Sequence, residues 1–204
     1  MIKFTKAVSA TTLVIALAAC SNNTDTSNNT FENSDNYGSN SVSVMSDTIT
    51  ITEAELKGNP FVKPWETPYG VPPFDIIKDS HFMPAIKAGI LELRKEIDEI
   101  VLNNDLPSFE NTIVALDLAG SQLSKVSSTF GNITGTDTND TLRSLQGKVS
   151  PLLTREYNKI QFNEDLFARV KFVYESRDSL NLDEQDARLL ELTHRGFVRA
   201  GANL

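Results

Sequence analysis

The chain of 204 residues contains one cysteine, two histidines and one tryptophan. A single cysteine excludes an intrachain disulfide. The histidines, His81 and His194, do not belong to an H-E-x-x-H pattern, which would place two zinc ligands on one helix face. The sequence also lacks a glycine-rich phosphate loop and the G-x-S-x-G turn that exposes a serine nucleophile. We therefore assign no catalytic residue and no metal ligand to this chain, and each histidine is interpreted as a helix-end or surface residue.

Positive charge is also scarce. Nineteen Lys and Arg stand against 27 Asp and Glu, which gives a formal net charge of −8. This balance argues against nucleic-acid binding and against broad electrostatic adhesion to anionic lipid. The acidic residues are scattered over helix faces and do not form a block, so we interpret them as surface charge that favours solubility.

The N-terminal residues have the pattern of a secretion signal. Lys3 and Lys6 precede a short apolar stretch that is too short to cross a bilayer, and Leu17-Ala18-Ala19-Cys20 follows. This tetrapeptide resembles the lipobox of bacterial lipoproteins, in which the cysteine is lipidated. We therefore predict a signal peptide at 1–19, a lipid anchor at Cys20 and a location in the bacterial cell envelope.

The residues after Cys20 are almost wholly Ser, Asn, Thr and Asp. They carry too little apolar surface to offset the entropy of ordering, so residues 20–52 are predicted to be a flexible tether. By analogy with enterobacterial sorting, Ser21 after the cysteine favours the outer membrane, with the domain facing the periplasm. The only strand-like alternation is TITIT at 48–52.

From residue 79 onward the apolar residues recur at three- and four-residue steps, which predicts amphipathic helices. We expect helices at 79–102, 108–131, 139–160, 166–174 and 184–198. The short connections indicate antiparallel neighbours, so the fold class is all-α.

Several local details are predicted for these helices. Pro84 should lie in the first turn of its helix, and Pro151 should kink or break its own. Gly120 and Ser127 lie on the inner stripe of an unbroken second helix. The stretch from Gly131 to Gly135 should end this helix. Arg94–Asp98 and Lys95–Glu99 are spaced as ion pairs on a solvated face.

The segment NPFVKPWETPYGVPPFD, residues 59–75, cannot be a helix because of its prolines. Two interpretations are open for it. It is either a polyproline ligand for an aromatic groove or an extended arm, residues 53–78, whose aromatic residues pack onto the helical domain.

Three other patterns are weak. Asp137-Thr138-Asn139-Asp140 is similar to the start of a calcium loop, but the central glycine and the bidentate glutamate are absent, so a helix C-cap followed by an N-cap explains it better. Asp98 and Glu99 lie on a solvated face. Arg195 and Arg199 share a helix face, where they could bind a carboxylate or pair with acidic residues of a neighbouring helix.

The phrases PPFD, FENTIVAL, TNDTLRSLQ and FVRAGANL, in this order between residues 59 and 204, resemble the N-terminal region of bacterial peptidyl-dipeptidases. These dipeptidyl carboxypeptidases belong to the thimet oligopeptidase family of zinc peptidases. The resemblance implies that 59–75 is an arm on a helical domain, 79–204, that forms one wall of a channel for short peptides. In the family the H-E-x-x-H helix comes later in the chain, so this chain is expected to be a portion that is inactive alone.

The resemblance thus implies zinc and short peptide substrates for the full-length family, but no cofactor within this chain. A separate C-terminal catalytic chain is a further expected partner. The alternative is a non-catalytic helical lipoprotein that binds short peptides or a partner chain.

Overall fold

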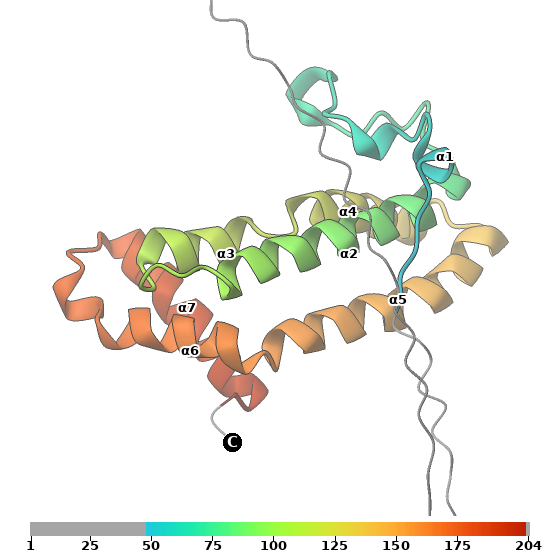
Figure 1. The fold of residues 1–204 in the computed structure, drawn as a ribbon. Coiled ribbons are helices and arrows are strands. Elements are labelled where there is room, and N and C mark those ends of the chain that lie inside the picture. The colour runs from blue at the N-terminus through green and yellow to red at the C-terminus, as the bar shows by residue number, and fades with distance from the viewer. Residues whose placement is uncertain (1–47, 203–204) are drawn as a thin grey trace, which may run out of the picture. The chain divides into compact units, whose positions relative to one another are not determined.

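The structure is a computed structural model that describes residues 48–202. The predicted all-α class is confirmed, since no strand occurs in this range. The expected signal peptide, the expected lipidation site Cys20 and most of the expected tether lie outside the described residues. The helices and short helical turns, shown in Figure 1, are α1 (Glu53–Leu56), η1 (Pro60–Val62), η2 (Pro68–Gly70), α2 (Asp79–Val101), η3 (Phe109–Val114), α3 (Ala115–Leu118), α4 (Ser121–Thr136), α5 (Asp140–Gln161), α6 (Glu164–Glu175), η4 (Arg177–Ser179) and α7 (Glu184–Ala200).

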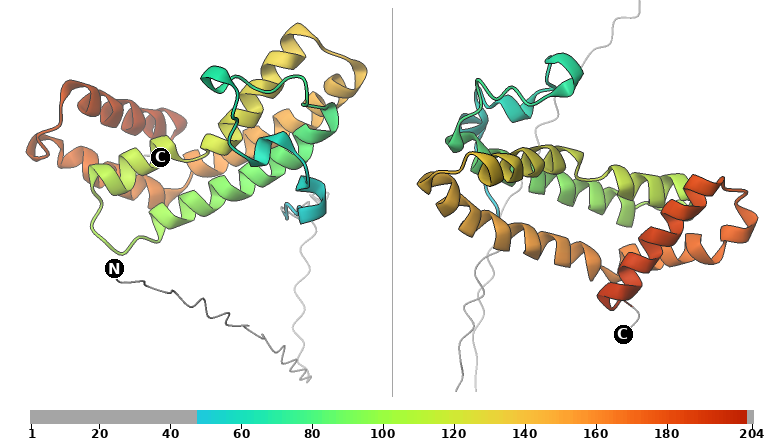
Figure 2. Two further views of the ribbon diagram at one scale, coloured as in Figure 1. Left: turned by 90° about the horizontal axis from the view of Figure 1, so that it is seen from above. Right: turned by 180° about the vertical axis from the view of Figure 1, so that it is seen from behind.

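Helix α2 is the central element. It packs most extensively on α4 and also contacts α5, α6 and the η1 turn, as Figures 1 and 2 show. Its buried stripe follows the predicted three- and four-residue steps: Phe82, Ala85, Ile86, Gly89, Ile90, Leu93, Ile97 and Ile100. At Gly89 an added Cβ would lie 2.9 Å from the Cα of Leu123 in α4. The two helices therefore meet backbone to backbone at this glycine, which the sequence pattern did not single out.

The prediction of one continuous second helix is wrong. It consists of a π-helix (η3), α3 and α4, and the chain turns at Gly120 with φ of +75°. Glycine adopts this left-handed conformation without the steric cost of a Cβ. The backbone N–H of Gly120 donates to Oε2 of Glu96 at 2.7 Å, which satisfies a donor that the helix break frees. The predicted stop from Gly131 to Gly135 lies one residue before the last residue of α4, Thr136.

Two prolines lie within helices. Pro84 is six residues into α2, beyond the predicted first turn, and α5 continues through Pro151 without the predicted break. Proline removes the hydrogen bond to the carbonyl four residues earlier. Those carbonyls belong to Ser80 and Gly147, both of which are exposed. Water can satisfy them, which explains why both helices tolerate their proline.

Short polar side chains begin most of the helices. Asn139, Asn163 and Asp183 each accept a hydrogen bond from a backbone N–H in the first turn, at 2.8–2.9 Å. Asp137 is the C-cap of α4 and Asn139 the N-cap of α5, which confirms the cap interpretation of the GTDTND segment. The TITIT stretch forms no strand, and its last residue, Thr52, caps α1.

The segment expected to be the arm, residues 53–78, contains α1 and the turns η1 and η2. Phe61 is fully buried, and its ring lies 5.4 Å from Phe82 and 5.9 Å from Trp65 between centroids. Tyr69, in contrast, is fully exposed and Phe74 is half exposed. Only part of the aromatic content of this segment therefore packs on the helices.

Arg169 of α6 holds the loop between α2 and η3. Its guanidinium donates to the carbonyl of Asn103 at 2.9 Å and to Oδ1 of Asn111 at 3.3 Å. Arg169→Met is expected to lower the free energy of unfolding by about 1–3 kcal/mol, because these acceptors lose their partner. Urea unfolding measures the change. Lys171→Met on the same helix is the matched control and should have an effect below about 0.5 kcal/mol; equal effects of the two variants would contradict the assigned role of Arg169.

No helix among residues 48–202 combines the length and the apolar character that a membrane crossing requires.

Candidate functional site

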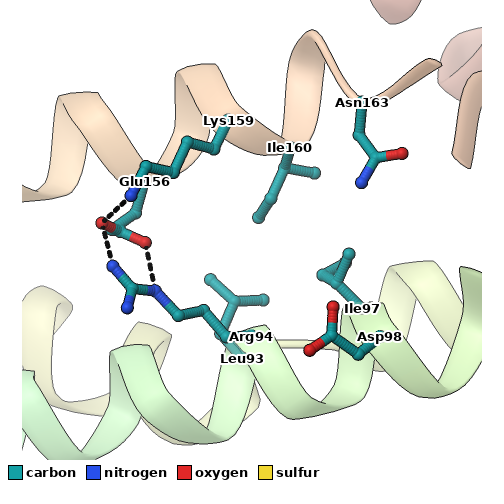
Figure 3. A pocket seen from close by; sticks show the side chains of 8 residues that line it. All are labelled: Leu93, Arg94, Ile97, Asp98, Glu156, Lys159, Ile160 and Asn163. Carbon is teal, nitrogen blue, oxygen red and sulfur yellow. Dashed lines mark hydrogen bonds and ion pairs between the residues drawn. The ribbon is translucent and has the colours of Figure 1, made fainter. Parts of the chain in front are cut away.

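A cavity of about 310 Å³ lies between α2 and α5, and Figure 3 shows it from close by. Helix α2 contributes one side, and the C-terminal part of α5 with the following Asn163 contributes the other. The lining residues are Leu93, Arg94, Ile97, Asp98, Glu156, Lys159, Ile160 and Asn163.

One side of this cavity is closed by an ion cluster. Nε and Nη2 of Arg94 donate to the two carboxylate oxygens of Glu156 at 2.7 and 2.6 Å, and Nζ of Lys159 lies 3.4 Å from the same carboxylate. Glu156 is 3% exposed. The hydrogen bonds from Arg94 lower the pKa of Glu156 and outweigh burial, which acts to raise it. The cluster therefore links the two helices through a charged, bidentate pair.

Arg94 reaches across to Glu156 of α5, which is not the i,i+4 partner that the sequence predicted for it. The predicted Lys95–Glu99 pair is present at 3.5 Å. Glu156 was missed, although the sequence carries a signal for it. It falls at a helical step between Leu152 and Ile160 on the apolar stripe of α5, where a carboxylate must find a partner.

The middle of the cavity is apolar. Leu93, Ile97 and Ile160 point into it, while Asp98 and Asn163 lie at the end away from the ion cluster, as Figure 3 shows. The positive charges of Arg94 and Lys159 are directed at Glu156, so the cavity does not offer an unbalanced cationic site for an anion. Its chemistry suits an apolar side chain better than a reacting group.

The two histidines occupy separate sites. His81 lies in the first turn of α2, where Nδ1 accepts a hydrogen bond from the backbone N–H of Lys78 at 3.0 Å. This is the predicted helix-end position. His194 of α7 is half-buried and stacks on Tyr174 of α6, with ring centroids 3.8 Å apart and an angle of 3° between the planes. Among residues 48–202, no group of three or more His, Cys, Asp or Glu side chains is arranged to hold a metal ion.

Arg195, one of the two arginines noted in the sequence, pairs with Glu191 of its own helix at 3.2 Å. Arg195 therefore pairs within α7, whereas one sequence interpretation had expected an acidic partner on a neighbouring helix. Asp98 and Glu99 are both exposed, as the sequence interpretation of a solvated face requires.

The stacking of His194 of α7 on Tyr174 of α6 is expected to stabilise the fold in a pH-dependent way. Burial is the main cause that lowers its pKa below 6.5, although Glu175 opposes the shift while Lys171 and Arg177 add to it. The neutral ring therefore stabilises the fold fully above pH 6.5, and this contribution is lost as the pH falls through the lowered pKa. The difference in free energy of unfolding between wild type and His194→Phe should shift in favour of the variant between pH 7.5 and 5.5. Urea titrations at several pH values measure it, and a pH-independent difference would refute the prediction.

Comparisons with known proteins give two strong sequence relatives and a more distant one. The chain is 43% identical over 146 residues to a dipeptidyl carboxypeptidase of Escherichia coli strain K12, which covers 72% of this chain and 21% of that protein. A dipeptidyl carboxypeptidase of Salmonella typhimurium is 42% identical over 149 residues, covering 73% and 22%. Oligopeptidase A of Salmonella typhimurium is 22% identical over 141 residues, or 69% of this chain and 21% of that protein. No family model matches the chain.

The matched region spans about a fifth of the length of these relatives. Identity above 40% over nearly three quarters of the chain confirms the resemblance carried by the sequence phrases. The chain therefore belongs to the peptidyl-dipeptidases of the thimet oligopeptidase family and represents an N-terminal part of such a protein.

Proposed function

We propose that this chain forms the N-terminal helical part of a zinc-dependent dipeptidyl carboxypeptidase that releases C-terminal dipeptides from short peptides. The observation that carries the proposal is the 43% identity over 146 residues to a dipeptidyl carboxypeptidase. In this proposal the helices α2 to α7 form one wall of the substrate channel, and the catalytic residues belong to the four-fifths of the relatives that the match does not cover.

The described residues of this chain do not fit a zinc ion, since no group of potential ligands is assembled among them. The zinc of the proposed enzyme would therefore be bound outside this region. Residues 48–202 contribute a helical framework in which α2 contacts several other helices and the Arg94–Glu156 pair links α2 to α5.

A chimaeric enzyme tests this proposal. Residues 59–202 of this chain would replace the matched segment of the Escherichia coli dipeptidyl carboxypeptidase, and release of the C-terminal dipeptide from an N-acylated peptide would be measured. We expect zinc-dependent release that a chelator abolishes, with the unaltered Escherichia coli enzyme as the reference. A folded, zinc-loaded chimaera that releases no dipeptide would refute the proposal.

We further propose that the protein is anchored in the bacterial outer membrane through a lipid on Cys20, facing the periplasm. The lipobox-like Leu17-Ala18-Ala19-Cys20 supports this. Radiolabelled palmitate should be incorporated into the full chain in bacteria and should be absent from Cys20→Ser. Equal labelling of both proteins would refute the anchor.

A further inference from the structure

Exposed apolar side chains are concentrated on one short segment. Among residues 48–202, five of the twelve exposed large hydrophobic residues lie between positions 62 and 76. Tyr69 is fully exposed, and the other four are 42–54% exposed. We name this set the arm surface: Val62, Tyr69, Val71, Phe74 and Ile76. Such a density on so short a segment is typical of an interaction site.

The arm surface is held firmly at its N-terminal end. Nδ2 of Asn59 donates to the carbonyl of His81 at 2.8 Å, and Phe61 is fully buried beside it. Nζ of Lys125 in α4 donates to the carbonyl of Lys63 at 2.9 Å and lies 4.2 Å from the ring centroid of Trp65. The N-terminal end of the segment, which is blue-green in Figure 2, is thus fixed to α2 and α4.

Tyr69 is the unusual residue of this surface. Its φ is +60°, and the following Gly70 has φ of +67°. A residue with a Cβ is strained in this left-handed conformation. The turn is closed by backbone hydrogen bonds from Gly70 to Thr67 and from Val71 to Pro68. The ring of Tyr69 is nevertheless fully exposed to solvent.

The net charge of the segment is small. Within residues 62–76 the charged residues are Lys63, Glu66 and Asp75, and their formal charges sum to −1. Val62 and Ile76 themselves line a hollow of about 720 Å³. Its walls also include Pro64, Trp65 and Pro73, together with the charged Lys63 and Glu66. A partner that fits this surface therefore presents apolar or aromatic side chains, one of which could enter the hollow.

We propose that the arm surface is the docking site for the remaining four-fifths of the peptidyl-dipeptidase polypeptide. This inference rests on the proposed function, because it assumes that the chain works as part of such a protein. We infer this partner because about four-fifths of the length of the relatives lies outside the matched region. That larger region of the polypeptide must contact the matched region through some surface. Among the described residues, the arm surface combines a dense set of exposed apolar side chains, an anchored N-terminal end and an exposed aromatic residue in the left-handed conformation.

Photo-crosslinking in the chimaera described above tests the docking site. The photoreactive residue p-benzoylphenylalanine would replace Tyr69, and Lys95, an exposed residue on the charged face of α2, would be the control position. We expect position 69 to crosslink to a peptide outside the replaced segment, identified by mass spectrometry, and position 95 to give no comparable product. Crosslinks only within residues 59–202, only between two chimaera molecules, only to lipid, or none at all would overturn the proposal.

A second measurement applies if the chimaera does not fold. The full chain would be co-expressed with the Escherichia coli protein lacking its matched segment, and co-purification would be measured. Tyr69→Ser/Phe74→Ser should weaken the association by about tenfold or more, since exposed aromatic residues dominate such contacts. Leu102→Ser/Leu106→Ser, which changes two exposed leucines after the far end of α2, should leave it unchanged.

Absence of co-purification with the wild-type chain, or equal loss in both double variants, would overturn the docking site. The proposed function is judged separately, by dipeptide release. A chimaera that is active but gives no crosslink from position 69 refutes the docking site alone. One that crosslinks but releases no dipeptide refutes the proposed function alone.

Discussion

Phe61→Ala is expected to lower the free energy of unfolding by about 3–5 kcal/mol, the range typical of removing a fully buried phenylalanine. Phe61 has no solvent exposure. Its ring joins Trp65 to Phe82, which in turn lies 5.1 Å from Phe130 of α4 between centroids. The substitution therefore opens a cavity at the point where the arm segment meets both α2 and α4. Urea unfolding followed by circular dichroism measures the loss.

Phe74→Ala is the matched control, because Phe74 lies on the same segment and is half exposed. Its effect in the isolated chain should stay below about 0.5 kcal/mol. Trp65 is the only tryptophan, so its fluorescence reports on this contact directly. In Phe61→Ala the emission should shift to longer wavelength as Trp65 loses its apolar neighbour. Unchanged emission together with a loss below about 1 kcal/mol would show that Phe61 does not hold the segment in place.

Arg94→Leu is expected to lower the free energy of unfolding by about 3 kcal/mol, because it removes the bidentate partner of the buried Glu156 carboxylate and leaves the longer contact with Lys159 at 3.4 Å. Arg94→Leu/Glu156→Leu should recover a large part of the loss, since two apolar side chains can replace a buried ion pair. Lys95→Leu, which removes only the exposed pair with Glu99, should change stability by less than about 0.5 kcal/mol. Equal stability of the single and double variants would contradict the assigned role of Glu156.

Acid should weaken the effect of Arg94→Leu. The pKa of Glu156 is lowered from 4.5, so the ion pair contributes fully above pH 4.5, and its contribution is lost as the pH falls through the lowered pKa. The stability difference between wild type and Arg94→Leu should therefore be constant between pH 6 and 8 and should shrink below pH 4.5. A difference that persists unchanged in acid would indicate that Arg94 stabilises the fold through packing of its aliphatic part.

The sequence pattern predicted those helices whose position is determined by residues within the helix itself. The stripe from Phe82 to Ile100 places α2 because apolar residues at helical steps must share a buried face. The caps Asn139 and Asp183 act within one turn, so they too are visible in the sequence. The break at Gly120 was missed because the apolar spacing continues through it, and its left-handed turn is stabilised by Glu96, 24 residues earlier.

The candidate site was less predictable because its contacts are long-range. Arg94 and Glu156 are 62 positions apart, and the local i,i+4 rule assigned Arg94 to Asp98 instead. The direction of Tyr69 was missed for a similar reason. Its proline-rich segment excludes a helix but does not determine which aromatic ring turns inward. The family, in contrast, was identified from residues 59–204, because the order of several specific phrases carries more information than helix periodicity.

The contact between Gly89 and Leu123 also limits which sequences this fold can accept. A methyl group at position 89 would lie 2.9 Å from a backbone atom of Leu123, so shortening the side chain at 123 would not make room for it. The only adjustment left is to move α4 away from α2. Because α4 also carries Lys125, which holds the arm segment through the carbonyl of Lys63, that movement would displace a surface 26 residues before Gly89 in the sequence. Position 89 therefore requires glycine, because only a hydrogen atom there lets α2 and α4 lie as close together as they do.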